Sequence, residues 1–449
     1  MPAQQCAGIN PELSSKKLIM NSTSINFGPI MLAPGVSRRH VACYLFAAGV
    51  SIGLFTYLVS LSPYILTVNL GIPEAEQGRL MGNLQFLQEI VVILSISWWG
   101  AMSDRFGRRS IYVISWLIMG VAYLTYSFAT SIPQLMAFRV IYALAIAAST
   151  TCLSAILADY PSEQSRGKFT GMAFILNGLG AVAFFAGLNQ LPDIFQKNGV
   201  DELWSGRYAF LFAAALSFIA SIVMIGLKPG RPEGVAPKTP ISQLIREALK
   251  AAQNKRIGLA YFGAFAARAD MIIITLFLVL WVVNASNAAG LTMGEAQARA
   301  GMFVGITSLA AVIWAPIFGI ISDKINRLTA MILAFGLAAI GYTWLGTLTD
   351  VVSFSATIPA LLFVGIGQSS TALASTVMLG QESPVEYRGS VFGMQNFFGA
   401  LGILFISSAG GYMFDLIGPG TPFIAIGAAN ALVLIVGLIL WKHESSKTS

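Results

Sequence analysis

The sequence is long but poor in charge. Only 10% of its 449 residues are charged, whereas 56% are hydrophobic; soluble proteins carry about 25% charged residues. So few charges cannot cover a water-exposed surface on a chain of this length, and we expect most of it to face lipid. The net charge of +7 does not predict a nucleic-acid partner, because the basic residues lie in loops rather than on one amphipathic face.

Cysteine and histidine are also scarce, and each scarcity excludes a class of site. The three cysteines (Cys6, Cys43 and Cys152) lie far apart, which excludes a disulfide framework and a cysteine metal site. Both histidines, His40 and His443, fall outside the apolar segments, so no histidine relay or metal ligand is available within a membrane. We therefore expect no cofactor, no metal and no enzymatic activity.

Apolar segments of membrane-spanning length are what the sequence has in abundance. A helix needs about 20 residues to cross a bilayer, and twelve segments are long and apolar enough. They are residues 41–65, 77–100, 110–130, 133–158, 167–190, 207–227, 257–283, 296–321, 328–348, 354–380, 389–413 and 420–441. The sequence thus predicts an all-α membrane protein with twelve transmembrane helices.

The polar remainder consists of two tails and one long linker. Residues 1–40 lack the apolar core of a signal peptide and are expected to form a cytoplasmic N-terminal tail without fixed structure, and residues 442–449 a C-terminal one. Residues 228–256 are expected to form a cytoplasmic linker. Within it, residues 241–250 have the periodicity of a short amphipathic helix.

The distribution of Lys and Arg predicts the orientation in the membrane. With the amino terminus inside, the cytoplasmic segments carry 21 of the 27 basic residues and the outer segments carry four. Positive charge is retained on the cytoplasmic side of membrane proteins. Both termini are therefore expected in the cytoplasm, with the protein in a bacterial inner membrane or a plasma membrane.

Two short motifs recur in the second half of the chain. The charged turn at residues 100–109 (GAMSDRFGRR) has a weaker copy at residues 319–327 (GIISDKINR), 219 positions later. Residues 166–172 (RGKFTGM) recur at residues 388–394 (RGSVFGM), 222 positions later. Two motifs repeated in the same order at nearly one offset indicate a tandem duplication, which is a known way of building transporters.

These motifs resemble those of the major facilitator superfamily, over residues 41–441. The turn at 100–109 is similar to that family's signature loop between its second and third helices, and Arg139 resembles the single arginine of the fourth helix. The resemblance implies two pseudo-symmetric six-helix bundles, at residues 41–227 and 257–441, that rock around a shared cavity. Span five lacks the Gly-Pro pair usual in the family's drug–proton antiporters.

The resemblance also implies a set of gating contacts at the cytoplasmic side. Asp104 is expected near the start of span eleven, Arg108 is expected to pair with Asp159, and Lys324 or Arg327 is expected to pair with Glu382. These contacts should form in the outward-facing state and break in the inward-facing one. The gating candidates are Gly100, Asp104, Arg105, Gly107, Arg108, Asp159, Arg166, Asp323, Arg327, Glu382 and Arg388.

Four charged residues fall well inside the predicted spans: Glu89, Arg139, Arg268 and Asp270. Each costs about 2.5–3.5 kcal/mol at the bilayer centre if it faces lipid, so we expect them to face protein or water. Gln85 lies four positions before Glu89 and shares its helical face. A carboxyl in such surroundings favours its protonated form, which makes Glu89 the first candidate for a proton-carrying group. The alternative is a structural ion pair between helices.

Arg268 and Asp270 lie two positions apart in span seven, so their side chains point in nearly opposite directions on a helix. We expect Arg268 to face the cavity, on a stripe with Tyr261, and Asp270 to face a neighbouring helix. Gln368 and Asn396 are uncharged candidates for solute binding. Each can equally serve as a hydrogen bond between helices.

These features predict a secondary active transporter. No Gly-x-x-x-x-Gly-Lys nucleotide loop occurs, so an ion gradient is expected to drive it, with protons as the coupling ion and Glu89 or Asp270 titrating. Arg139 and Arg268 favour an organic anion or zwitterion as the solute. The alternatives are a proton antiporter of organic cations or drugs, a uniporter, and a receptor that does not transport. A monomer is expected.

Overall fold

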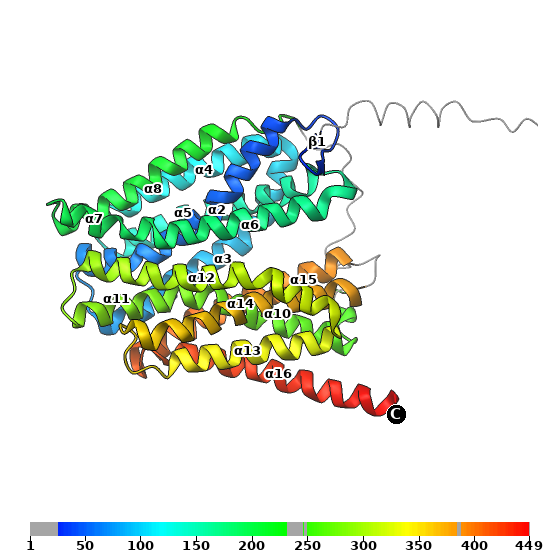
Figure 1. The fold of residues 1–449 in the computed structure, drawn as a ribbon. Coiled ribbons are helices and arrows are strands. Elements are labelled where there is room, and N and C mark those ends of the chain that lie inside the picture. Colours follow the sequence, from blue (N-terminus) through cyan, green and yellow to red (C-terminus); the bar gives the residue numbers. More distant parts are fainter. Residues whose placement is uncertain (1–25, 231–245, 247–248, 384–387, 449) are drawn as a thin grey trace, which may run out of the picture.

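The computed structural model describes residues 26–230, 246, 249–383 and 388–448. Two groups of helices lie one above the other in Figure 1. The first bundle contains α2 (Arg38–Tyr64), α3 (Glu74–Phe106), α4 (Arg108–Tyr126), α5 (Ile132–Asp159), α6 (Arg166–Ala186), α7 (Leu191–Lys197) and α8 (Glu202–Met224). The second contains α10 (Lys255–Ile273), α11 (Val279–Ala288), α12 (Met293–Lys324), α13 (Arg327–Gly346), α14 (Phe354–Glu382), α15 (Arg388–Leu416) and α16 (Thr421–Thr448).

The prediction of an all-α membrane fold in two bundles is confirmed. Eleven helices of the described chain are long and apolar enough to cross a membrane. The remaining predicted span is α4, a 19-residue helix between α3 and α5. Two spans continue through one π-helical turn each, at Ile65–Asn69 after α2 and at Ile274–Leu278 between α10 and α11. The predicted helix at residues 241–250 lies largely outside the described residues.

A single residue, Gly107, joins α3 to α4. Its φ of 89° is one that side chains rarely adopt. A Cβ atom there would also lie 2.7 Å from the carbonyl oxygen of Gly230. Glycine is therefore the residue that this sharp turn requires, and it brings the two helices together without a loop.

The expectation of an unstructured amino-terminal tail is wrong for residues 26–37. Strands β1 (Asn26–Phe27) and β2 (Ile30–Met31) form a hairpin, and the next residue, Leu32, makes a β-bridge with Pro161. The Ile30 and Leu32 side chains are each 2% exposed. Their burial against the α5–α6 connection stabilises the segment, which we call the amino-terminal strap.

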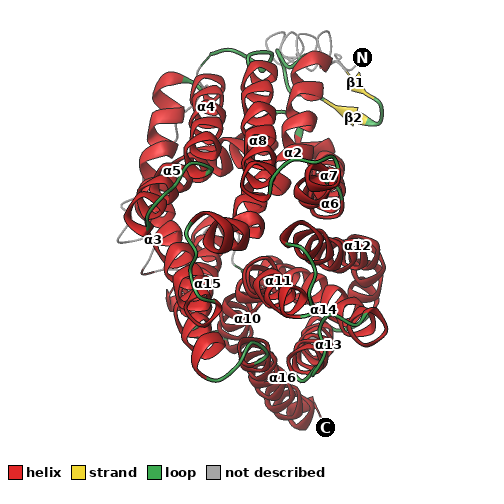
Figure 2. Cartoon of the chain, turned by 90° about the vertical axis from the view of Figure 1, so that its left-hand side faces the viewer, coloured by secondary structure: helices red, strands yellow, loops and turns green. Residues whose placement is uncertain are grey.

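Each bundle has two ends, and the ends differ in how the bundles meet. The terminal end is the one where α2 begins and α16 ends, and the opposite one is the distal end. Figure 2 is viewed from the distal end and shows α3 beside α15 and α12 near α6. At the distal end, the Asp415 carboxylate of α15 accepts hydrogen bonds from the backbone N–H groups of Gly78 (2.9 Å) and Arg79 (2.8 Å), and from Arg79 Nε at 3.2 Å.

We call these contacts of Asp415 with Gly78 and Arg79 the distal clamp. They require the backbones of α3 and α15 to approach closely. A Cβ atom on Gly78 would lie 2.3 Å from an Asp415 carboxylate oxygen, and one on Gly82 would lie 2.2 Å from the carbonyl oxygen of Ser407. Small residues let helices in a membrane approach closely enough for polar contacts. The Asp415 side chain is only 1% exposed, so its three hydrogen bonds are shielded from water.

A second distal contact joins α12 to the first bundle. The Gln297 side chain, which is fully buried, donates to the carbonyl oxygen of Ser60 (2.8 Å) and to the side-chain oxygen of Asn189 (3.0 Å). Among the described residues, every hydrogen bond or ion pair between the two bundles lies at this end. In the described part of the chain, hydrogen bonds and ion pairs thus join the two bundles at the distal end and not at the terminal end.

We expect Asp415→Asn to loosen the distal end. The substitution removes the charge that accepts three hydrogen bonds, and a hydrogen bond to a charged group contributes about 1.5–3 kcal/mol. A cysteine at the buried position Ser407, in a background without Cys6, Cys43 and Cys152, should then react about tenfold faster with a maleimide.

Asp350→Asn provides the control, because among the described residues the Asp350 carboxylate accepts only from Val352 and Ser353 of its own loop. An equal labelling rate at position 407 with and without Asp415→Asn would contradict a closing role for Asp415.

Candidate functional site

Arg139 is a buried cation inside the first bundle. It lies on α5 and is 1% exposed. Its Nη2 donates to Gln85 Oε1 on α3 at 3.0 Å, and its guanidinium carbon lies 5.7 Å from the centre of the Tyr142 ring. Its Nε and Nη1 have no hydrogen-bond partner among the described residues. A buried guanidinium with two unused donors and no carboxylate is suited to receive an anion.

Glu89 lies one turn after Gln85 on α3 and is half-buried. It interacts electrostatically with Arg268, which belongs to α10 in the other bundle. Arg268 is exposed, and its Nη2 donates to Asn396 Oδ1 on α15 at 3.3 Å. Its stem lies over Gly399, where a Cβ atom would be 2.5 Å from Arg268 Cγ. The charge of Arg268 thus acts on an acid of the other bundle.

Asp270 lies on the opposite side of α10, inside the second bundle. It is fully buried. Its carboxylate accepts hydrogen bonds from Asn430 Nδ2 of α16 at 2.8 Å and from Thr371 Oγ1 of α14 at 3.2 Å. The Tyr342 hydroxyl donates to the backbone carbonyl of Asp270 at 2.8 Å. Asp270 and Arg268 therefore have different surroundings, although only one residue separates them.

The uncharged candidates for solute binding lie on helices of the second bundle. Tyr261 is 2% exposed and stacks on Phe398 with ring centres 5.4 Å apart and planes at 10°. Gln368 is half-buried on α14, and its carbonyl accepts from the Thr371 hydroxyl. Thr371 and Asn430 were not among the residues predicted from the sequence. Each is a polar residue within an apolar run, and this pattern could have identified them.

The signature turn forms contacts within the first bundle. Arg108 Nε lies 2.5 Å from the Asp159 carboxylate, the pair that the family resemblance implies, and Arg108 Nη1 lies 3.5 Å from Asp104. The pair is present although the bundles are fastened distally. The side chain of Arg388 lies outside the described residues, so the contact of Asp104 with the start of α15 stays a prediction.

The other members of the signature turn are placed as follows. Arg105 lies 5.4 Å from the centre of the Phe106 ring, and Gly100 lies within α3. Arg166, a gating candidate outside this turn, lies at the start of α6 and is exposed.

The expected pairing of Lys324 or Arg327 with Glu382 is not present among the described residues, and for the outward-facing state it stays a prediction. Arg327 contacts Asp323 at 3.3 Å, four residues earlier in the repeat of the signature turn. Glu382 instead accepts from Arg256 Nη1 at 2.8 Å. Arg256 lies in the segment that the sequence suggested was linker, but the structure places it in the first turn of α10, within reach of the end of α14.

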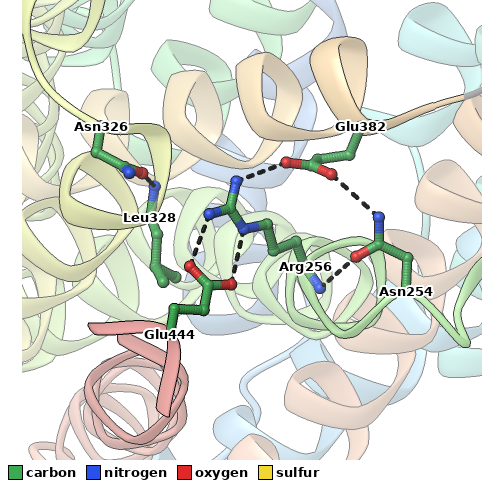
Figure 3. A network of polar contacts seen from close by, with 6 residues as sticks. All are labelled: Asn254, Arg256, Asn326, Leu328, Glu382 and Glu444. Carbon is green, nitrogen blue, oxygen red and sulfur yellow. Dashed lines mark hydrogen bonds and ion pairs between the residues drawn. The ribbon is translucent and has the colours of Figure 1, made fainter. Parts of the chain in front are cut away.

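Arg256 also binds the end of the last helix (Figure 3). Its Nε and Nη2 donate to the two carboxylate oxygens of Glu444 at 2.9 and 2.6 Å, and Asn254 Nδ2 donates to Glu382 at 3.0 Å. One guanidinium therefore joins α10, α14 and α16 at the terminal end of the second bundle. This Arg256 network acts inside one bundle and not between the two.

The membrane-spanning helices in two bundles, with few charged side chains between them, define a multi-pass membrane transporter. The chain belongs to the Major Facilitator Superfamily, because the family model matches residues 43–406 and again residues 260–449. Membership places the chain among transporters and not among enzymes.

Individual relatives agree with this membership. The chain is similar to magnetosome protein MamH of Paramagnetospirillum magneticum, with 26% identity over 420 residues that cover 91% of this chain and 94% of MamH. Magnetosome protein MamZ of the same organism is 29% identical over 87% of this chain, which spans only 61% of MamZ.

Solved structures share the fold at low identity. The nucleoside transporter NupG has a TM-score of 0.71 at 12% identity and covers 89% of this chain and 99% of its own. A D-xylose-proton symporter has a TM-score of 0.65 at 16% identity and covers 89% and 97%. These likenesses establish the arrangement of helices and nothing about the solute.

We expect Arg256→Gln to destabilise the protein by about 1–2 kcal/mol, because it removes two partly exposed ion pairs that share one guanidinium. The thermal unfolding midpoint should fall, and the difference from the wild type should shrink in 1 M salt, where the screening length is about 3 Å. Lys255→Gln, at the exposed neighbouring position, is the control. An unchanged midpoint for Arg256→Gln would show that the network contributes nothing to stability.

Proposed function

We propose that this chain is a secondary active transporter that moves a small organic anion or zwitterion by alternating access, with protons as the coupling ion. The observation that carries the proposal is Arg139, a fully buried guanidinium whose Nε and Nη1 have no partner among the described residues. An uncompensated buried charge costs several kcal/mol. A negatively charged group of the solute would supply the missing compensation.

Gln85 keeps Arg139 available. A carboxylate in that position would neutralise the guanidinium, whereas the Gln85 amide oxygen holds Nη2 at 3.0 Å and leaves the charge uncommitted. The neutral partner thus positions the cation without competing with an anionic solute. Arg268, exposed on the facing bundle, is the second cation that such a solute would meet.

Glu89 is the group that we propose to carry the proton. Its electrostatic partner Arg268 belongs to the other bundle, so rocking of the bundles changes the distance between the two charges. When Arg268 moves away, the half-buried carboxylate loses its compensating charge and takes up a proton. Asp270, the other candidate from the sequence, is enclosed inside one bundle and does not experience this movement.

The orientation follows from charge. The predicted cytoplasmic segments hold 21 of the 27 Lys and Arg residues. Their described parts lie at the terminal end, and we propose that this end faces the cytoplasm. The distal contacts of Asp415 and Gln297 then correspond to an inward-facing state. The Arg108–Asp159 contact is present in it, contrary to the expectation that this contact breaks when the protein faces inward. Among the relatives are an arabinose-proton symporter of Escherichia coli and a 4-hydroxybenzoate transporter of Pseudomonas aeruginosa, which supports proton coupling and an anionic solute as hypotheses for this chain.

Two other functions remain as alternatives. A proton antiporter of organic cations would use Glu89 and leave Arg139 without a role, and a multidrug resistance protein of Bacillus subtilis is 24% identical over 82% of this chain. A receptor that does not transport would keep the same two bundles but would not accumulate a solute under a pH gradient.

Flux into proteoliposomes under an imposed pH gradient tests the proposal. The first probes are 4-hydroxybenzoate as an anion and 5-aminolevulinic acid as a zwitterion, with a quaternary ammonium cation as the opposing class. We expect Glu89→Gln to abolish accumulation driven by the gradient while exchange of solute across the membrane persists, because the neutral amide cannot bind a proton. Uptake of the cation alone, or accumulation that survives Glu89→Gln, would contradict the proposal.

Gln85→Glu is a second test, with nearly unchanged side-chain volume. A carboxylate there would pair with Arg139, so we expect solute affinity to fall at least about tenfold, since a hydrogen bond to a charged group contributes about 1.5–3 kcal/mol. The thermal unfolding midpoint should not fall, because the new pair satisfies a buried cation. Gln134→Glu, at an exposed distal position, is the control. Unchanged affinity in Gln85→Glu would remove Arg139 from the binding site.

A further inference from the structure

Asp270 has a buried carboxylate and no cationic partner. Its exposed fraction is 0%, and among the described residues its carboxylate has only two contacts, with the neutral donors Asn430 and Thr371. Leaving a carboxylate unpaired in such an interior costs several kcal/mol. The nearest charge along the chain, Arg268, points toward Asn396 on α15 and does not compensate it.

The other charges on the surrounding helices are distant along their sequences. Asp270 is packed among α10, α13, α14 and α16, whose described termini hold the remaining ionisable groups, several turns away. They are Lys255, Arg256, Arg327, Glu382, Lys442, His443 and Glu444. Tyr342 contacts the Asp270 backbone as a hydroxyl donor and brings no positive charge.

A second unsatisfied atom belongs to Asn430, the residue whose Nδ2 contacts the carboxylate. Asn430 is fully buried, and its Oδ1 has no hydrogen-bond partner among the described residues. Its Nδ2 is held by Asp270 Oδ1 at 2.8 Å and by the carbonyl of Ile426 at 3.0 Å, which fixes the amide against the carboxylate. An uncompensated anion and an unused carbonyl oxygen therefore occur together, and a cation would satisfy both.

The oxygen types present are those that bind hard cations. Asp270 supplies a carboxylate, Thr371 a hydroxyl and Asn430 an amide oxygen, and such oxygens suit hard metal ions in preference to soft ones. One carboxylate balances one positive charge. A divalent ion would leave a net positive charge in a buried site, so the charge balance selects a monovalent ion.

We propose that Asp270, Thr371 and Asn430 form a sodium-ion site inside the second bundle. The ion would join α10, α14 and α16, three helices that the Arg256 network already joins at the terminal end. The site goes beyond the proposed transport of an anion, because it contains neither Arg139 nor Glu89. Binding to the resting protein can be measured without any solute, so this proposal and the proposed function can fail separately.

Thermal unfolding of the purified full-length protein tests the site. The midpoint is measured in sodium, potassium and choline chloride at equal ionic strength, because a ligand that binds only the folded state raises it. We expect sodium to raise the midpoint by several degrees over choline, and potassium to do so less. Asp270→Asn should abolish the sodium-specific shift, since the neutral amide no longer balances the ion.

Thr371→Val is the second variant, and Thr307→Val is its matched control. Thr307 is also a buried threonine whose hydroxyl donates to a carbonyl of its own helix, as that of Thr371 does. Among the described residues, only Thr371 of the two contacts Asp270. The sodium shift should shrink in Thr371→Val and persist in Thr307→Val. If Asp270→Asn does not fold, this pair decides the question.

Three results would overturn the sodium site. One is a wild-type midpoint that is the same in sodium and in choline. Another is a sodium shift that survives Asp270→Asn or is equal in the two threonine variants. The third is stabilisation by acidification alone, lost in Asp270→Asn and independent of sodium, which would assign a proton to the carboxyl instead.

Discussion

The cost of a charge that is removed from water governs this structure. A membrane-spanning helix cannot hold an ionised side chain unless protein, water or a ligand compensates it. The described spans accordingly hold few ionised side chains, and the partners of these side chains differ. Glu89 experiences the charge of Arg268 in the other bundle, and Asp415 binds backbone N–H groups. Arg139 and Asp270 have only neutral partners among the described residues. The last two are the residues for which a bound ion or solute is the missing partner.

The two ends of the protein use charge differently. At the distal end, Asp415 is shielded and joins the bundles through the backbone of α3, where close helix contact is needed. At the terminal end, Arg108 and Arg256 are partly exposed and each acts within one bundle. Exposed pairs are individually weak, so they stabilise each bundle as a unit without opposing its movement relative to the other.

Much of the fold could be predicted from the sequence, because a long apolar run crosses a bilayer as a helix. Hydropathy predicts the spans, and the repeated motifs predict the two bundles. The distal clamp was not accessible, since Asp415 binds main-chain groups of Gly78 and Arg79 that no side-chain pattern reveals. The contact of Glu382 with Arg256 was not accessible either, because the sequence pattern counts Arg256 with the linker.

The amino-terminal strap has a consequence for how the protein is made. The backbone N–H of Ala33 donates to the Tyr160 carbonyl, and the Lys228 ammonium donates to the Pro34 carbonyl. Both partners are translated long after the strap itself. The strap therefore cannot complete its contacts until the six spans of the first bundle have been synthesised, and its docking is a late step in the assembly of that bundle.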